Sequence, residues 1–390
     1  MTGNRYGTMT TSSSIKVKPR TWFCRPLDSG NVPNIFTSVI FAVLVFLIII
    51  AHQGQAASGP DWAFLNRTNL LEVVSNGRVK PVRSIEDWRT RRDSIKAAMQ
   101  EVMGPLPGNE KRCALDVRIE EETDLGSYVR QFMTYAAEPR GRVPAYLLIP
   151  KASLNSTRKT PAVLALHQTH ALGQKVVVGL GNSTNDEYGV SLVKRGFVVL
   201  APAYPQLANY QPDLKALGYQ SGTMKAIWDN IRGLDLLESL PYVRTNSFAA
   251  IGHSLGGHNS IYTSAFDDRI KVVVSSCGFD SFRDYKNGDI RGWTSDRYMP
   301  RLLQYPLSAL PFDFHEVIGC LAPRPFLVNA PIGDTNFKWQ SVDNVCREAR
   351  KVYDLYGAAD RLKVEHPDCE HRFPPEIQKE AFELIERTLR

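Results

Sequence analysis

The sequence lacks the features that mark several specialised classes of protein. It has no internal repeat and no low-complexity tract, so a repeat array is not indicated. No two cysteines form a C-x-x-C pair, and neither a zinc site nor a disulfide framework is therefore expected. The six cysteines are Cys24, Cys113, Cys277, Cys320, Cys346 and Cys369. We expect most of them to be small, buried apolar residues.

A strong charge imbalance is also missing. The formal net charge is +7, but residues 1–57 carry five basic side chains against Asp28 alone, a net +4, so the rest of the chain carries only +3. This small surplus gives no reason to expect nucleic acid as a partner.

No motif predicts a metal or a cofactor. The chain has 390 residues, 43% of them apolar, which is enough for one large α/β domain with an extension, or for two domains.

One long apolar run, residues 35–51, is present near the start. Its 17 residues carry no charge, follow a basic segment rich in serine and threonine, and precede small residues at Gly54, Ala56 and Ala57. This pattern predicts an export signal over residues 1–57, which would place the protein in the periplasm or outside the cell. Membrane attachment through an uncleaved 35–51 segment is the alternative.

The rest of the chain divides by its periodicity. Residues 58–110 predict a helical extension, because Ser84 and Asp87 form a capping pair before a helix. Between residues 112 and 151, apolar residues recur with a period of two, which predicts antiparallel strands. From residue 162 onward, short apolar strands alternate with amphipathic helices. We therefore expect an α/β domain over residues 111–390, with a mostly parallel sheet and helices on both faces.

The stretch 247–258 reads S-F-A-A-I-G-H-S-L-G-G-H. An apolar strand runs into a G-x-S-x-G motif centred on Ser254, and a segment compatible with a helix follows. Such a sharp turn leaves no room for a Cβ two positions before or after the serine. Gly252 and Gly256, which have no Cβ, occupy these two positions. The pattern predicts a nucleophile elbow that exposes Ser254 Oγ and places the Leu255 N–H beside an attacked carbonyl.

A serine hydroxyl is a poor nucleophile unless an imidazole takes its proton and a carboxylate orients that imidazole. In an open α/β sheet these partners are expected just past the carboxyl ends of the strands. Asp334 follows the next-to-last predicted strand and His371 follows the last, which gives the chain order Ser, Asp, His. We predict Ser254, Asp334 and His371 as the catalytic residues, with Asp280 and His366 as the alternative acid and base.

The loop after the first apolar strand of the parallel region is expected to supply a second hydrogen-bond donor for the oxyanion. We predict the Thr169 N–H for this role and the Gln168 N–H as the alternative. His167 is predicted to brace the loop, whereas His170 is left open between a structural role and contact with substrate. Two histidines beside the nucleophile are interpreted as structural: His253 and His258.

Several phrases resemble a known superfamily: G-H-S-L-G-G (252–257), L-H-Q-T (166–169), R-G-F-V-V-L-A-P (195–202), L-A-P-R-P (321–325) and D-C-E-H-R-F-P (368–374). Over about residues 110–390 the chain resembles the α/β-hydrolase superfamily, and within it the dienelactone hydrolase-like and acetyl xylan esterase-like branch. The resemblance implies an α/β-hydrolase fold with a cap insertion after the sixth strand. Dienelactone hydrolases use a cysteine nucleophile, so Ser254 disfavours that activity, and Gln168 stands where glycine is usual.

The segment 279–315 is long for a plain connection, so we expect it to cap the pocket and shape specificity. Trp293 and Tyr298 in it, together with His170, are predicted to contact substrate, although the aromatic rings could equally serve only to pack the cap. We predict an exported serine hydrolase that cleaves carboxylic esters through an acyl-enzyme, with an acetylated or otherwise esterified carbohydrate, or a small-molecule ester, as substrate. The alternatives are a serine peptidase, whose usual large accessory domain is missing, and a catalytically silent binding protein.

Overall fold

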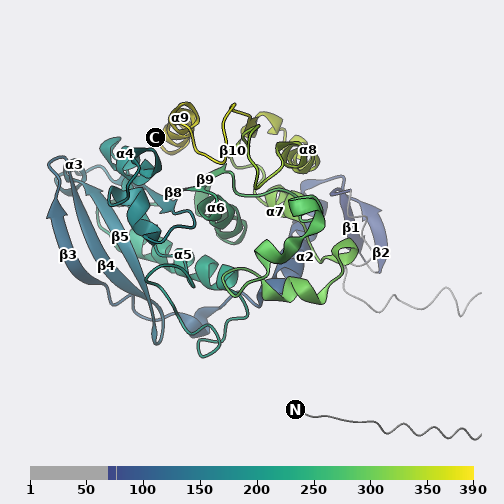
Figure 1. The fold of residues 1–390 in the computed structure, drawn as a ribbon, viewed down its shortest axis with the longest axis horizontal. Helices are drawn as coiled ribbons and strands as arrows, with labels where there is room; N and C mark the ends of the chain where they lie inside the picture. The colour runs from purple at the N-terminus through teal and green to yellow at the C-terminus, as the bar shows by residue number, and fades with distance from the viewer. Residues whose placement is uncertain (1–68, 76) are drawn as a thin grey trace, which may run out of the picture. The chain divides into compact units, whose positions relative to one another are not determined.

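The computed structural model describes residues 69–75 and 77–390 (Figure 1). The apolar run at 35–51, and with it the predicted export signal, lies outside these residues. Within the described part of the chain, no helix has both the length and the apolar character needed to cross a membrane.

The strands are β1 (Glu72–Ser75), β2 (Arg78–Pro81), β3 (Arg118–Asp124), β4 (Tyr128–Glu138), β5 (Gly141–Pro150), β6 (Thr160–Leu166), β7 (Val198–Pro202), β8 (Val243–His253), β9 (Ile270–Ser276), β10 (Phe326–Asn329) and β11 (Leu362–Glu365). The α-helices are α2 (Ile85–Met103), α3 (Lys151–Leu154), α4 (Tyr188–Lys194), α5 (Gly222–Ser239), α6 (Leu255–Phe266), α7 (Phe314–Gly319), α8 (Trp339–Leu355) and α9 (Pro375–Leu389).

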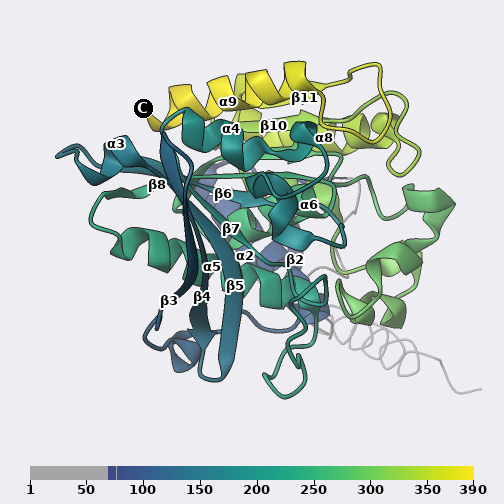
Figure 2. The same ribbon diagram turned by 60° about the vertical axis from the view of Figure 1, so that its left-hand side comes forward.

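Nine strands form one sheet in the order β11-β10-β9-β8-β6-β7-β5-β4-β3. Strands β6 to β11 are parallel, whereas β3, β4 and β5 run antiparallel to their neighbours and form one edge of the sheet, as Figure 2 shows. The predicted mostly parallel sheet, preceded by antiparallel strands, is confirmed. Strand β8, which leads to the G-x-S-x-G motif, is paired on both sides and therefore rigidly held.

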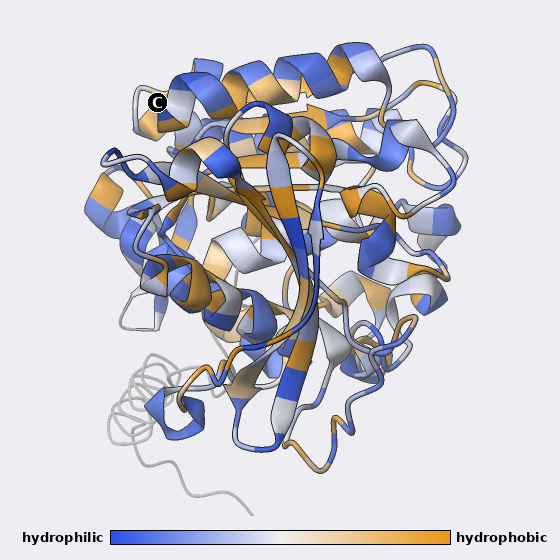
Figure 3. Ribbon diagram, turned by 90° about the vertical axis from the view of Figure 1, so that its left-hand side faces the viewer, coloured by the Kyte–Doolittle hydropathy of each residue, from blue (hydrophilic) through white to orange (hydrophobic). Residues whose placement is uncertain are grey.

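Both faces of the sheet are covered, because alternate residues of each central strand enter two separate apolar clusters. In β6, Ala162 and Leu164 pack on the side of α5, α6 and α8, whereas Val163 and Ala165 pack on the side of α4 and α9. Figure 3 shows the central strands as largely hydrophobic and α9 as alternately hydrophobic and hydrophilic. This double burial explains why the parallel strands read as continuous apolar runs in the sequence.

The region before the main domain contains more than the predicted helix. Helix α2 begins as expected, with a capping box in which the Ser84 side chain accepts from the Asp87 N–H and the Asp87 side chain accepts in return. A buried ion pair of 2.5 Å between Arg91 and Glu316 joins α2 to α7. The hairpin β1–β2 comes first. Strand β2 is fully exposed and β1 buries only Val73, so no apolar alternation predicted the hairpin.

The segment 279–315 follows β9, which is the seventh strand of the large sheet along the chain. It is folded as four short 3-10 helices: Tyr285–Gly288, Ile290–Trp293, Pro300–Gln304 and Leu307–Ala309. Its last two residues, Phe314 and His315, already belong to α7. Most of its aromatic rings are buried against one another and against Phe314, which holds the segment in place without long helices.

The close approach of α6 to β6 generates a first prediction. An added Cβ at Gly256 would lie 1.8 Å from the Leu166 carbonyl oxygen, so we expect Gly256→Ala to lower the free energy of unfolding by roughly 3 kcal/mol or more, or to prevent folding. The control is Gly357→Ala, where φ is +64° but no atom lies within 4 Å, and the left-handed strain should cost only about 1–2 kcal/mol. Urea unfolding measures both variants, and equal losses would contradict the steric explanation.

Candidate active site

The backbone at Ser254 is strained. Its φ and ψ are 52° and −118°, a left-handed conformation that non-glycine residues seldom adopt. The residue lies between β8 and α6, and its N–H donates to the Ser276 carbonyl at 2.7 Å, which ties the turn to the end of β9. The sharp strand-to-helix turn predicted from the G-x-S-x-G motif is thus present, and it directs the hydroxyl away from the sheet toward the loops at the carboxyl ends of the strands.

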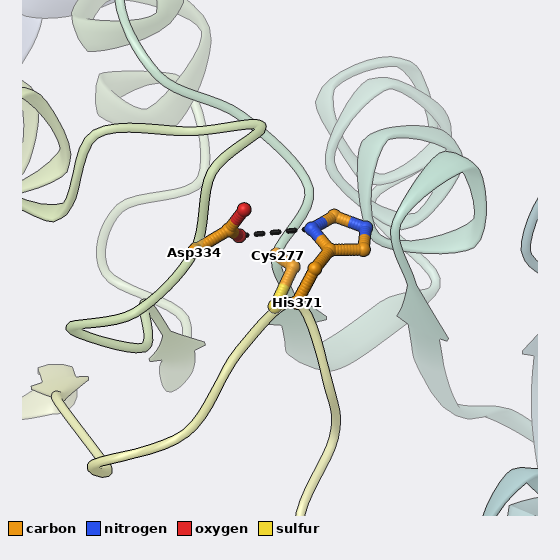
Figure 4. Close-up of side chains that lie close together, drawn as sticks. All are labelled: Cys277, Asp334 and His371. Atoms are coloured by element: carbon orange, nitrogen blue, oxygen red, sulfur yellow. Dashed lines mark hydrogen bonds and ion pairs between the residues drawn. The ribbon is translucent and has the colours of Figure 1, made fainter.

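The structure brings together the side chains of Ser254, Asp334 and His371. His371 Nε2 lies 2.9 Å from Ser254 Oγ. On the other side of the ring, His371 Nδ1 lies 2.9 Å from Asp334 Oδ2, a contact that Figure 4 marks with a dashed line. The other oxygen, Asp334 Oδ1, accepts from the N–H groups of Asn336 and Phe337 at 2.7 and 3.1 Å. The carboxylate is therefore fixed on one side by backbone and on the other by the imidazole.

Burial works against the charge on Asp334, since it alone would raise the pKa of the carboxyl. The hydrogen bond and charge of His371, with the two backbone N–H donors, outweigh burial and hold the pKa of Asp334 below its usual range. The group is therefore an ionised carboxylate at neutral pH. An ionised carboxylate fixes the Nδ1–H tautomer of the ring, which leaves Nε2 free to accept a proton from Ser254.

The alternative acid and base have other partners. His366 contacts the Ala330 carbonyl through Nδ1 at 2.7 Å and the Asp343 carboxylate through Nε2 at 3.0 Å. Asp280 is buried, and its Oδ2 accepts from the Lys338 N–H at 3.0 Å. Burial raises the pKa of Asp280 to about 7. Asp280 therefore anchors the segment that follows Asp334 and does not contact the imidazole of His371 in this arrangement.

Two backbone N–H groups are available beside Ser254. Those of Leu255 and Thr169 have no hydrogen-bond partner within residues 69–75 and 77–390, and both residues line a cavity with Ser254. Gln168 does not line that cavity, which favours Thr169 over Gln168 as the second donor. His167 braces the loop: its Nδ1 contacts the Gln168 carbonyl at 2.8 Å and its Nε2 accepts from the Tyr204 N–H at 3.0 Å.

The cavity beside Ser254 has a volume of about 200 Å³. Its lining residues are Thr169, Ser254, Leu255, His258, Tyr285, Gly292, Trp293, Tyr298, Asn336 and Phe337. None carries a formal charge at neutral pH if His258 is neutral, and five of them are aromatic or imidazole rings. Trp293 and Tyr298 are thus placed where the sequence predicted substrate contacts. His170, the third predicted substrate contact, does not line the cavity. Its Nδ1 instead accepts from the Leu172 N–H at 3.1 Å.

Sequence reasoning missed three side chains around the site. Cys277 directly follows β9 in a left-handed conformation (φ 48°), with its Sγ close to the Asp334 carboxylate and the His371 ring. Asn329 ends β10, and its Nδ2 donates to the Arg372 carbonyl at 2.8 Å, which fixes the loop that carries His371. His258 is buried and stacks on Trp293 with ring centroids 5.0 Å apart, and neither ring nitrogen has a hydrogen-bond partner among the described residues. For Cys277 and Asn329, the only signal in the sequence was their position at or directly after the end of a predicted strand.

Three buried histidines make stability depend on pH. Burial lowers the pKa of His167 to about 4 and the pKa values of His253 and His258 to about 3. The unfolded chain binds these protons below pH 6.5 and the folded chain does not, so the free energy of unfolding falls as the pH falls from 6.5 toward 4. Each histidine contributes a slope of up to about 1.4 kcal/mol per pH unit.

We therefore predict that His258→Phe, which keeps a ring in the aromatic cluster, loses less stability than the wild type between pH 7 and pH 5. Urea unfolding at several pH values gives the two slopes. The same slope in both proteins would show that His258 is not held neutral by its burial.

Comparison with known proteins agrees with this geometry. A family model described as glucuronyl esterase of fungi matches residues 216–357, a range that includes Ser254 and Asp334 and ends before His371. Two curated relatives are the protein YtaP of Bacillus subtilis (strain 168), 25% identical over 74% of this chain and 96% of its own length, and the 4-O-methyl-glucuronoyl methylesterase of Phanerochaete carnosa (strain HHB-10118-sp), 23% identical over 79% of this chain and 78% of its own.

A solved structure with the same fold is the glucuronoyl esterase from Solibacter usitatus. It superposes with a TM-score of 0.68 and 17% sequence identity, over 83% of this chain and 98% of that one. The sheet order, the strained serine turn and this neighbour show that the protein has the α/β-hydrolase fold. The expected fold is confirmed.

Proposed function

We propose that the protein is a serine esterase that hydrolyses glucuronoyl esters of carbohydrate. The observation that carries the proposal is the chain of hydrogen bonds from Asp334 through His371 to Ser254, which opens onto an uncharged cavity walled by aromatic rings. The glucuronyl esterase model across residues 216–357 and the named relatives support this choice of ester.

The geometry supports a double displacement. His371 Nε2 takes the proton of Ser254 Oγ as the oxygen attacks the ester carbonyl, and Asp334 stabilises the imidazolium that forms. The N–H groups of Leu255 and Thr169 donate to the oxyanion. His371 then returns the proton to the departing alcohol, which leaves an ester between Ser254 and the acyl group. Water, deprotonated by the same imidazole, releases the acid and restores the serine.

The cavity fits the acyl part of such a substrate. In a glucuronoyl ester the carboxyl group is esterified and uncharged, so no cation is needed to receive it, and none lines the cavity. A sugar ring can lie against Tyr298, whose hydroxyl can serve the hydroxyl groups of the sugar, while the Trp293 ring is stacked on His258 and Phe337. A volume of about 200 Å³ exceeds what a two-carbon acetyl group would fill. This volume, together with the glucuronyl esterase model and the named relatives, is the reason to place the glucuronoyl ester ahead of the acetyl ester expected from the sequence.

Action outside the cytoplasm is part of the proposal, because polymeric carbohydrate esters are extracellular substrates and residues 1–57 have the pattern of an export signal.

Two other functions are compatible with the same fold. A serine peptidase would use the same catalytic residues to cleave a peptide, and a silent binding protein would keep the fold and lack turnover.

The test is release of glucuronic acid from its benzyl and methyl esters, beside 4-nitrophenyl acetate, acetylated xylan and a casein digest. We expect the glucuronate esters to have the highest kcat/KM, and Ser254→Ala to lower kcat by a factor on the order of 10⁴ or more. The matched control is Ser264→Ala in α6, the helix that follows Ser254. The buried hydroxyl of Ser264 has no hydrogen-bond partner in the described part of the chain, and its loss should leave turnover unchanged.

The competing functions give other results. Faster release of acetate than of glucuronic acid would replace the glucuronoyl ester with the acetyl ester. Peptide cleavage without ester hydrolysis would favour the peptidase, and no turnover of any of these compounds would leave only the binding protein.

A further inference from the structure

A thiol lies directly beside the catalytic acid and base. Cys277 is the residue after β9, is buried, and has its Sγ grouped with a carboxylate oxygen of Asp334 and a ring nitrogen of His371, all three atoms within 4.8 Å of one another. Figure 4 shows the three side chains converging from different segments of the chain. The double displacement described above gives no task to this thiol.

The three side chains are held by their surroundings. Cys277 Sγ lies 3.4 Å from the Arg372 carbonyl and 3.8 Å from Asn329 Nδ2. Asp334 Oδ1 is fixed by two backbone N–H groups, as described above. Such contacts set the orientation of potential ligands before any ion arrives, which is typical of built metal sites. The side chain of His371 keeps 27% of its surface exposed and that of Asp334 only 2%, so an ion has to enter the group from the side of the histidine ring.

We propose that Cys277, Asp334 and His371 form a binding site for a thiophilic divalent cation, with Zn²⁺ as the ion that fits best, and that its binding switches the active site off. The binding rests on these three residues alone. Only the inhibitory consequence rests on the proposed function.

The ligand set favours zinc over the common hard cations. Thiolate, imidazole and carboxylate are the usual ligands of Zn²⁺, at about 2.0–2.3 Å, and three of them leave a fourth tetrahedral position for water. Ca²⁺ and Mg²⁺ prefer six or more oxygen ligands, which these residues do not offer. Ligands of one tetrahedral ion lie roughly 3.3–3.8 Å apart. The widest pair, at up to 4.8 Å, therefore has to close by about 1 Å, and the Asp334–His371 pair, at 2.9 Å, has to open by about 0.5 Å. Both changes are within the reach of side-chain rotation.

Binding changes the proton on His371. The ion takes the place of the Nδ1–H donor between His371 and Asp334, so the neutral ring carries its proton on Nε2 and gives the Nδ1 lone pair to the metal. Cys277 loses its thiol proton to solvent, and Asp334 binds as the carboxylate it already is. One proton leaves for each ion bound. With Nε2 protonated, His371 cannot accept the proton of Ser254, and the serine is no longer activated.

The test uses Co²⁺ as a spectroscopic substitute for Zn²⁺ on the purified full-length protein. We expect Co²⁺ to produce a thiolate-to-cobalt charge-transfer band in the near ultraviolet, without any substrate present. Zn²⁺ should displace the cobalt and abolish the band. Zn²⁺ at micromolar concentration should also lower ester hydrolysis at least tenfold, and a chelator should restore it.

Variants separate this site from other thiols. Cys277→Ser should lose the band and require at least tenfold more Zn²⁺ for half inhibition relative to its own metal-free rate. Cys369→Ser, which removes a free and partly exposed thiol two residues before His371, should behave like the wild type. His371→Gln should lose the band as well. Thermal melting checks that each variant is folded, and Cys277→Ala replaces Cys277→Ser if the latter is not.

Two results would overturn the proposal: no charge-transfer band in the wild type, or equal zinc sensitivity in the wild type and the folded Cys277 variant. A wild type that shows the band yet hydrolyses no ester would instead leave the metal site standing and refute the esterase. The two proposals therefore fail separately.

Discussion

The contact between the first turn of α6 and the end of β6 is the constraint on which the site depends. Gly256 lies so close to the Leu166 carbonyl that no side chain fits between them. This approach holds the strained backbone of Ser254 in place, and it sets the loop that begins at His167 beside the nucleophile. The serine and both free N–H groups are thus parts of one rigid unit, which is what stabilisation of an oxyanion requires.

Charge is confined to a single place in this unit. The Asp334 carboxylate is held by His371 and by two backbone donors, whereas the histidines around it, His167, His253 and His258, are buried and neutral. A positive charge on any of them would compete with His371 for the field of the carboxylate. Their neutrality leaves Asp334 to act on His371 alone. Because the Asp334 carboxylate also lies close to Cys277 Sγ and to the His371 ring, Cys277 is a potential metal ligand.

Much of this arrangement could be predicted from the sequence, because it depends on local backbone geometry and on strand ends that must converge. The G-x-S-x-G motif predicted the strained turn at Ser254, and the strand order predicted which aspartate and histidine would approach it. The contributions of Cys277 and Asn329 could not be predicted, because they depend on contacts between β9, β10 and the loop of His371. For the same reason His258 was interpreted as purely structural, although it lines the cavity. The hairpin β1–β2 has no apolar alternation to reveal it, because its strands are four residues long and only Val73 is buried.

The central claim is that Ser254 is a nucleophile activated by His371. It is tested most directly by a fluorophosphonate probe, which reacts only with an activated serine, followed by mass spectrometry of the digested protein. The account predicts one labelled peptide, the one that contains Ser254, and labelling slowed at least a hundredfold in His371→Ala. An unlabelled wild-type protein, or a label on a different serine, would contradict it.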